Sequence, residues 1–188
     1  MARTQTLLMR DRRIANARGL VAFGIVDPET APCSLSRTVR SGKAGTIYTI
    51  GYEKKSGDGL IRELRASGVE VLADIRERPM SRLPDFRAAS LAMACTAAGI
   101  QYQGWACLGS TQAQRDELAE TGDIAQFHRV FRSYAKRQMK EDIVRLAAVC
   151  QDKVVALLCY ERRHEECHRS VIADLVADVM DASIIAVG

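Results

Sequence analysis

The sequence has no long hydrophobic run and few aromatic side chains. Its 188 residues are 47% hydrophobic but only 5% aromatic, so aliphatic side chains must fill the core. The longest strongly apolar run, residues 154–160, is too short to span a bilayer. The first ten residues lack the apolar stretch of a secretory signal. We therefore expect a cytoplasmic protein with no contact to a membrane.

Several common functional motifs are absent as well. The sequence contains no glycine-rich dinucleotide fingerprint and no P-loop lysine motif. A tyrosine-phosphatase-like loop needs arginine six positions after its cysteine, but Glu165 follows Cys159 there and Ala173 follows Cys167. The six cysteines are not spaced like a disulfide scaffold, so we expect reduced thiols. No cofactor is predicted, with zinc as the one alternative considered below.

Positive charge is concentrated near the N-terminus. The formal net charge of the chain is +4, whereas residues 1–45 hold eight Lys or Arg side chains against three acidic ones. Residues 41–45 have the composition of a linker. We therefore expect an N-terminal extension over 1–45, partly disordered or loosely attached, and an α/β domain over 46–188. The basic extension can bind nucleic acid; a solvated, poorly ordered leader is the alternative.

From residue 46 onward, short β-rich stretches alternate with segments of helical periodicity. Strands are predicted at 46–50, 69–75, 100–102, 153–159 and 184–187. Helices are predicted at 57–67, 86–98, 112–150 in two pieces, and 167–180. The apolar stretch 154–158 is typical of a strand covered on both faces. This alternation predicts an α/β fold with a mainly parallel sheet and flanking helices, in a Rossmann-like three-layer arrangement.

Polar side chains follow several of the predicted strands. Glu53 comes just after the first, Asp74 and Arg76 end the second, and Cys159 and Glu161 end the fourth. The carboxyl ends of parallel strands lie at one edge of the sheet, which is where ligands bind in open α/β folds. We therefore expect these side chains to converge. The alternative is that the charges form structural ion pairs, such as Asp74 with Arg76.

The segment 159–169 has a high density of reactive side chains, at the turn between a predicted buried strand and a helix. A helix start and nearby cations lower a thiol's pKa, so Cys167 or His168 can supply a nucleophile or a proton carrier. Glu161 or Asp74 would act as general base or metal ligand. A buried structural cysteine is the alternative. Four soft ligands could also hold zinc, although Cys-x2-Cys spacing is absent: Cys159, His164, Cys167 and His168.

Arginines flank the same turn. The loop 76–82 carries Arg76 and Arg82, and Arg169 sits in the first turn of the predicted helix, where a cation opposes the helix dipole. Guanidinium groups suit bidentate recognition of phosphate or carboxylate. We therefore predict that these three arginines hold an anionic ligand. Neutralisation of Arg169 by Glu165 or Glu166 is the alternative.

An ordered series of motifs runs through residues 49–169. It comprises Thr49-Ile50-Gly51-Tyr52-Glu53, Asp74-Ile75-Arg76 with Pro79-x-Ser81-Arg82 and Pro84-x-Phe86, Gly99-Ile100-x-Tyr102, Leu108-Gly109, Cys159-Tyr160-Glu161 and Cys167-His168-Arg169. This series resembles the bacterial and archaeal family catalogued as domain of unknown function 488, over about residues 46–170. The resemblance implies a compact α/β domain with a parallel sheet. The polar motif positions of the family also imply that Ser81 and Glu53 belong to the substrate-binding residues. Members often have glycine where Lys54 stands and proline near Ser110.

Three functions follow from these observations. The first is an enzyme that binds an anionic substrate (a phosphate-bearing molecule, a nucleotide or a nucleic acid) at the carboxyl edge of the strands. The second is a non-catalytic nucleic-acid-binding module that uses the basic N-terminal arm. The third is a zinc-stabilised adaptor. The predicted partner is thus an anionic small molecule or nucleic acid, and the sequence leaves catalysis and oligomeric state open.

Overall fold

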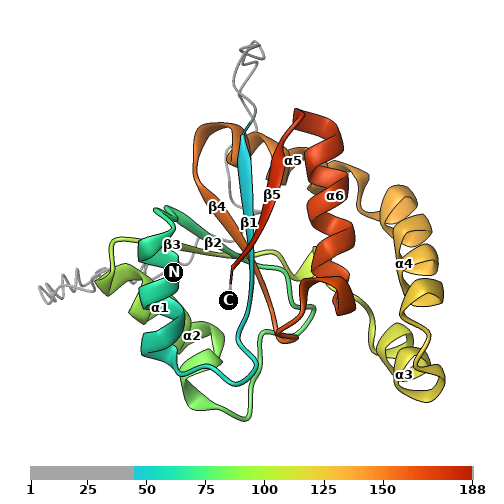
Figure 1. Cartoon of the computed structure of the whole chain (residues 1–188), viewed down its shortest axis with the longest axis horizontal. Helices are drawn as coiled ribbons and strands as arrows, with labels where there is room; N and C mark the ends of the chain where they lie inside the picture. The colour runs from blue at the N-terminus through green and yellow to red at the C-terminus, as the bar shows by residue number, and fades with distance from the viewer. Residues whose placement is uncertain (1–44, 188) are drawn as a thin grey trace, which may run out of the picture.

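The structure is a computed structural model that describes residues 45–187 (Figure 1). The predicted N-terminal extension, apart from Gly45, lies outside these residues. One sheet contains five strands, and every pair of neighbours is parallel. Its order is β3 (Gln101–Gly104), β2 (Val71–Asp74), β4 (Val155–Cys159), β1 (Thr46–Gly51) and β5 (Ser183–Val187). The predicted α/β fold with a parallel sheet and flanking helices is confirmed.

Six α-helices connect and flank these strands in the described part of the chain. They are α1 (Gly57–Ala66), α2 (Ala88–Ala97), α3 (Gln112–Thr121), α4 (Ile124–Gln138), α5 (Lys140–Asp152) and α6 (His168–Met180). The prediction of two helical pieces over 112–150 was wrong, because three helices occupy this stretch. Gly122 ends α3 with a φ of 65°, and the side chain of Asp123 caps α4. Met139 then separates α4 from α5.

The sheet is covered on both faces, and alternation along the strands divides the core in two. Ile47, Val155 and Leu157 belong to the half formed with α4, α5 and α6. Ile50 and Leu158 belong to the half formed with α1 and α2. In Figure 1, α4 stands beside α6, and α3 adjoins α4 on the outer side of the domain. No helix within residues 45–187 is long and apolar enough to cross a membrane.

The carboxyl ends of β2, β4 and β1 lie side by side, because β4 is paired with both of the other strands. The loop after β4 continues along β1, since the backbone N–H of Glu53 donates to the carbonyl of Tyr160 at 2.9 Å. This approach requires glycine at position 51: a Cβ there would lie 1.8 Å from the carbonyl oxygen of Glu161. Among residues 45–187, short 3-10 helices lie in the segments that follow β2, β3 and β4: η2 (Pro84–Phe86), η3 (Ala106–Leu108) and η4 (His164–Glu166).

Candidate functional site

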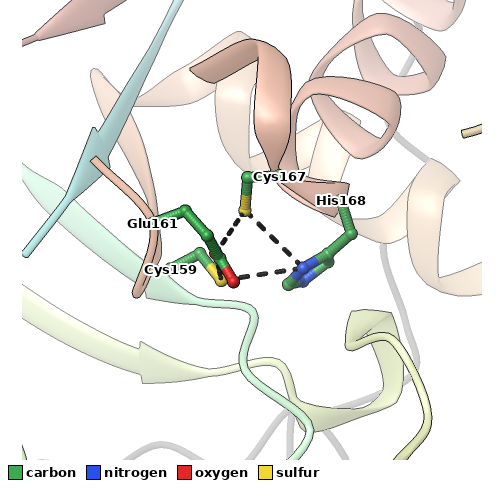
Figure 2. A group of neighbouring side chains, drawn as sticks. All are labelled: Cys159, Glu161, Cys167 and His168. Carbon is green, nitrogen blue, oxygen red and sulfur yellow. Dashed lines mark hydrogen bonds between the residues drawn. The ribbon is translucent and has the colours of Figure 1, made fainter. Parts of the chain in front are cut away.

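Four side chains with reactive or metal-binding atoms converge at the carboxyl end of β4 (Figure 2). Cys159 ends β4, Glu161 lies in the following loop, and Cys167 and His168 stand at the start of α6. Their ligand atoms all lie within 4.8 Å of one another. The Oε2 atom of Glu161 accepts hydrogen bonds from the thiols of Cys159 at 3.0 Å and Cys167 at 2.9 Å. We call this group the thiol cluster.

Local structure fixes the orientation of His168 and Cys167. The Nε2 atom of His168 lies 3.1 Å from the carbonyl oxygen of Ile75, which can only accept, so Nε2 carries a proton. The Nδ1 atom consequently faces the sulfurs, at 3.6 Å from Cys159 and 3.7 Å from Cys167. The ring also packs edge-on against Phe131. Cys167 caps α6, and its sulfur accepts a hydrogen bond from the backbone N–H of Arg169 at 3.4 Å.

The thiol cluster shifts the pKa values of its members in opposite directions. Burial opposes ionisation of Cys159, but a hydrogen bond with Cys167 and the charge of His168 lower the pKa of the Cys159 thiol well below its usual value. Burial and the neighbouring Cys159 raise the pKa of Cys167. Burial and the charge on Cys159 raise the pKa of Glu161. Burial acts against a charged His168, but the negative Cys159 raises the pKa of that imidazole. Within the cluster, deprotonation is therefore easier at Cys159 than at Cys167.

Arg169 shapes the loop that carries Glu161. Its side chain is buried, with 1% of the residue exposed, and its guanidinium donates to the carbonyls of Glu161 and, at 2.9 Å, Arg162. These bonds tie the loop to α6 and leave the carboxylate of Glu161 turned toward the cysteines. The Nε atom of Arg169 is buried and has no hydrogen-bond partner within residues 45–187, so the two loop carbonyls leave this one donor for the anion predicted at Arg169. The suggested neutralisation by Glu166 is not seen, because Glu166 pairs with Arg163 at 2.7 Å.

Asp74 and Arg76 form a second polar group at this edge, which we call the ion-pair network. The guanidinium of Arg76 binds both carboxylate oxygens of Asp74, at 2.8 and 2.5 Å. It also donates to the hydroxyl of Tyr52 at 3.0 Å and to the carbonyl of Phe86 at 2.9 Å. Tyr102 donates to Asp74 at 2.7 Å. Burial opposes the charge on Arg76, but the hydrogen bond and charge of Asp74 raise its pKa. The ion pair that the sequence offered as one interpretation of Asp74 and Arg76 is therefore present.

A cavity of about 390 Å³ opens beside the thiol cluster. Three members of the cluster line it, whereas the fourth, Cys167, does not. The close packing of its walls depends on Gly109, where a Cβ would lie 2.2 Å from the backbone nitrogen of Glu77. The lining consists of Tyr52, Arg76, Glu77, Arg78, Met80, Ser110, Gln112, Arg115, Cys159, Tyr160, Glu161 and His168.

The arginines of the cavity differ in how far they are neutralised. Arg76 is occupied by Asp74, and Arg115 pairs with Glu77 at 2.8 Å and also donates to the carbonyl of Ser110. Within residues 45–187, no hydrogen bond or ion pair is found for the exposed guanidinium of Arg78. Arg78 is therefore the cation of the wall that is available to a ligand.

Three predicted binding residues lie away from this cavity. The hydroxyl of Ser81 accepts from the backbone N–H of Leu83 at 3.2 Å, and Arg82 is exposed. Glu53 accepts from the backbone N–H of Arg162 at 3.1 Å and borders a separate hollow of about 230 Å³. The structure therefore brings none of the three to the thiol cluster.

The predicted zinc ligands come together in part. Cys159, Cys167 and His168 meet, but His164 turns away, and its Nδ1 atom lies 2.9 Å from the hydroxyl of Thr49. The fourth place is taken by Glu161. This arrangement could hold a metal ion with two sulfur, one nitrogen and one oxygen ligand.

Sequence reasoning did not assign a catalytic role to Cys159 and did not single out Arg78. The position of Cys159 as the last residue of a buried strand was a usable signal, because such residues border the ligand site of open α/β sheets. Arg78 lay within the basic loop, but nothing in the sequence separated it from Arg82. Arg115 comes from α3, which no sequence pattern placed near the cavity.

Comparison with known proteins agrees with the resemblance of the motifs. No match to the chain is found among curated proteins or among solved structures. The model of the domain of unknown function DUF488 matches residues 57–176, which include all four members of the thiol cluster. Because this match spans more than half of the sequence, the chain belongs to the DUF488 family.

Proposed function

We propose that the protein is an enzyme that binds an anionic, phosphate-bearing substrate in the cavity and acts on it with the thiol cluster. One observation carries the proposal: Cys159, Glu161 and His168 line the same space as Arg78, for which residues 45–187 supply no hydrogen-bond or ion-pair partner. The volume of about 390 Å³ lies within the range of small-molecule sites. Reactive side chains and an arginine that could bind an anion thus border one cavity of suitable size.

Arg78 supplies the affinity in this proposal. Its planar guanidinium forms charge-assisted hydrogen bonds with phosphate oxygens, and no internal partner has to be displaced. Arg115 offers weaker help because Glu77 already balances its charge. The closed ion-pair network supports the wall through Arg76 without contributing a free charge.

The thiol cluster supplies the reactive groups. The thiol of Cys159 passes its proton to His168, and the resulting thiolate forms a bond to the phosphorus of the substrate as the bond to the leaving group breaks. The leaving group takes that proton from His168, and water then hydrolyses the phosphoryl–cysteine bond, which restores the thiol and releases phosphate. The fixed tautomer of His168 supports this role, because its second nitrogen is held by the carbonyl of Ile75.

Calorimetric titration with inorganic phosphate, pyrophosphate and nucleoside monophosphates tests the binding step. We expect Arg78→Ala to weaken the affinity roughly 10- to 100-fold, since a hydrogen bond to a charged group contributes about 1.5–3 kcal/mol. The matched control is Arg82→Ala, which removes an exposed arginine of the same loop outside the cavity and should leave the affinity unchanged.

Turnover of any phosphate ester that binds is then followed by product analysis. We expect Cys159→Ala to retain binding and abolish turnover. Equal losses of affinity in the Arg78 and Arg82 variants would contradict the assignment of the cavity. Unchanged turnover in Cys159→Ala would contradict the role of the thiol cluster. The nucleic-acid role predicted for residues 1–45 stays a prediction, because those residues lie outside the described structure apart from Gly45.

A further inference from the structure

We propose that Cys159, Glu161, Cys167 and His168 bind one zinc ion at the wall of the cavity. Their ligand atoms are two sulfurs, one carboxylate oxygen and one imidazole nitrogen, all of which zinc accepts in proteins. The binding stands on the geometry of the thiol cluster alone, whereas the catalytic use of the ion rests on the function proposed above.

The distances in the cluster suit a tetrahedral zinc ion. With Zn–S near 2.3 Å and Zn–N near 2.0–2.1 Å, a tetrahedron separates sulfur from nitrogen by about 3.6 Å. The Nδ1 atom of His168 lies 3.6 Å from one sulfur and 3.7 Å from the other. The carboxylate oxygen of Glu161 is closer to the sulfurs, at 2.9 and 3.0 Å, whereas a tetrahedral zinc site separates oxygen from sulfur by about 3.6 Å. These two distances would therefore grow by about 0.6–0.7 Å on zinc binding.

The hydrogen bonds around the cluster are those that zinc ligands need. A metal-bound imidazole donates its other N–H to a carbonyl or carboxylate, which fixes the tautomer and aims the free nitrogen at the metal. His168 does this through Ile75 at 3.1 Å. The sulfur of Cys167 accepts the backbone N–H of Arg169, which stabilises a thiolate. The bonds from Arg169 to the loop carbonyls hold Glu161 facing the same point.

The charges of the cluster also favour a dication. Two thiols and a carboxyl group face one another at short range, and the imidazole supplies at most one positive charge. The two terminal nitrogens of Arg169, a cation at the start of the same helix, donate to carbonyl groups of the loop and to none of the acidic groups. A divalent ion neutralises both thiolates together and removes the repulsion between the three acidic groups.

The position of the cluster gives the ion access to substrate. Three of the four proposed ligands line the cavity, and Cys167 lies behind them. A carboxylate exchanges more readily than a thiolate, so water can replace Glu161 on the ion. That water would lose one proton to the released carboxylate, and the hydroxide left on zinc, in place of the Cys159 thiolate, would be the nucleophile at neutral pH. The protonated Glu161 would then give its proton to the leaving group as the bond to that group breaks.

Metal analysis of the full chain tests the binding. We expect one zinc per chain after purification without chelator, and competition against a chromogenic chelator gives the affinity. Cys167→Ser should weaken it by more than about 100-fold, since loss of even an outer hydrogen-bond partner costs about 10- to 100-fold. Two matched controls should keep the zinc: Cys107→Ser, a cysteine outside the cluster, and His164→Ala, a histidine of the same loop that bonds Thr49.

Cobalt provides a readout that does not depend on the folding of a variant. The wild-type chain is stripped with chelator, its fold is checked by circular dichroism, and Co²⁺ is titrated in. We expect a saturable thiolate-to-cobalt charge-transfer band at one equivalent, displaced by zinc. Absence of this band in folded, metal-free protein would overturn the proposal, as would equal zinc binding by wild type and Cys167→Ser.

The same samples separate the failure of this proposal from failure of the proposed function. If no zinc binds but Arg78-dependent phosphate binding and Cys159-dependent turnover persist, the metal site is overturned and Cys159 acts directly as a thiolate. Rapid alkylation of Cys159 by iodoacetamide would accompany that result. If zinc binds but Arg78→Ala changes nothing, the metal site stands and the anionic substrate is overturned.

Discussion

Two groups of polar side chains lie at the carboxyl edge of the sheet and border the same cavity. In the ion-pair network, the guanidinium of Arg76 is matched by a carboxylate, a hydroxyl and a carbonyl. In the thiol cluster, three acidic groups share one imidazole, and both thiols donate to the same carboxylate oxygen. The first group has a partner for its charge within the protein, and the second has more acidic groups than positive charge.

This difference suggests that one group stabilises the cavity wall and the other binds and reacts with ligands. A buried ion pair with complete hydrogen bonding gains little from a ligand, because any new contact must break an existing one. A cluster of acidic groups with little positive charge gains much from a cation, because the cation favours loss of their protons. We therefore assign the ion-pair network to the stability of the wall and the thiol cluster to binding and chemistry, and the following substitutions test that division.

The largest effect on stability is expected from Asp74→Asn. This substitution leaves the buried charge of Arg76 uncompensated and turns an amide N–H₂ toward a donor. We expect the free energy of unfolding to fall by about 3–5 kcal/mol, measured by urea denaturation. In the metal-free protein the matched change Glu161→Gln should cost less than about 1 kcal/mol, because burial and Cys159 already favour the neutral form of that carboxyl.

Equal stability of Asp74→Asn and Glu161→Gln would contradict the assignment of a stabilising role to the ion-pair network alone. A stable Asp74→Asn protein that lost phosphate affinity would place the ion-pair network in the binding machinery instead of the supporting wall.

The next effect is expected from Arg169→Leu. The substitution removes the donors for two loop carbonyls and should lower the free energy of unfolding by about 2–3 kcal/mol. Arg82→Ala, on the exposed loop, should change it by less than about 0.5 kcal/mol. Unfolding curves in urea give both values. Unchanged stability of Arg169→Leu combined with lost phosphate binding would instead support the anion-holding role predicted from the sequence.

The smallest effect is expected from Lys54→Gly. Lys54 has a φ of 62°, a conformation that favours glycine, which the family resemblance also places there. We expect the free energy of unfolding to rise by about 0.5–1 kcal/mol, because the strain on the Cβ is relieved. The change lies outside both polar groups, so zinc content and phosphate affinity should stay at wild-type values. A destabilised variant would show that the long side chain of Lys54 contributes packing.

The strands and the edge that holds the site could be predicted because both depend on local patterns. The spacing of hydrophobic residues, together with the Gly and Pro residues that interrupt it, located all five strands. The rule that parallel strands end at the same edge of a sheet then placed Asp74 and Cys159 together. Whether Asp74 and Arg76 are fully hydrogen-bonded depends on Tyr52, Tyr102 and Phe86. These residues come from other elements, and only the fold brings them close. No local pattern reports such distant partners.

The sequence could not show whether His164 or Glu161 joins the two cysteines and His168. Both stand in the loop between β4 and α6, and histidine is the commoner zinc ligand. The bonds from Arg169 to the carbonyls of that loop turn Glu161 inward, while Thr49 engages His164. Backbone direction within a short irregular loop decides the ligand set, and composition does not encode it.

Gly51 has a practical consequence for anyone who wishes to redesign this protein. The Cβ of an alanine would meet backbone atoms, at 1.8 Å from the carbonyl oxygen of Glu161, and no side chain could rotate to make room. Libraries that vary the lining of the cavity can therefore leave this position untouched, since even one methyl group there would displace the segment that bears the carboxylate. The absence of a Cβ at position 51 thus determines where the loop lies, and changes of specificity are better attempted at Met80 or Gln112, which also line the cavity.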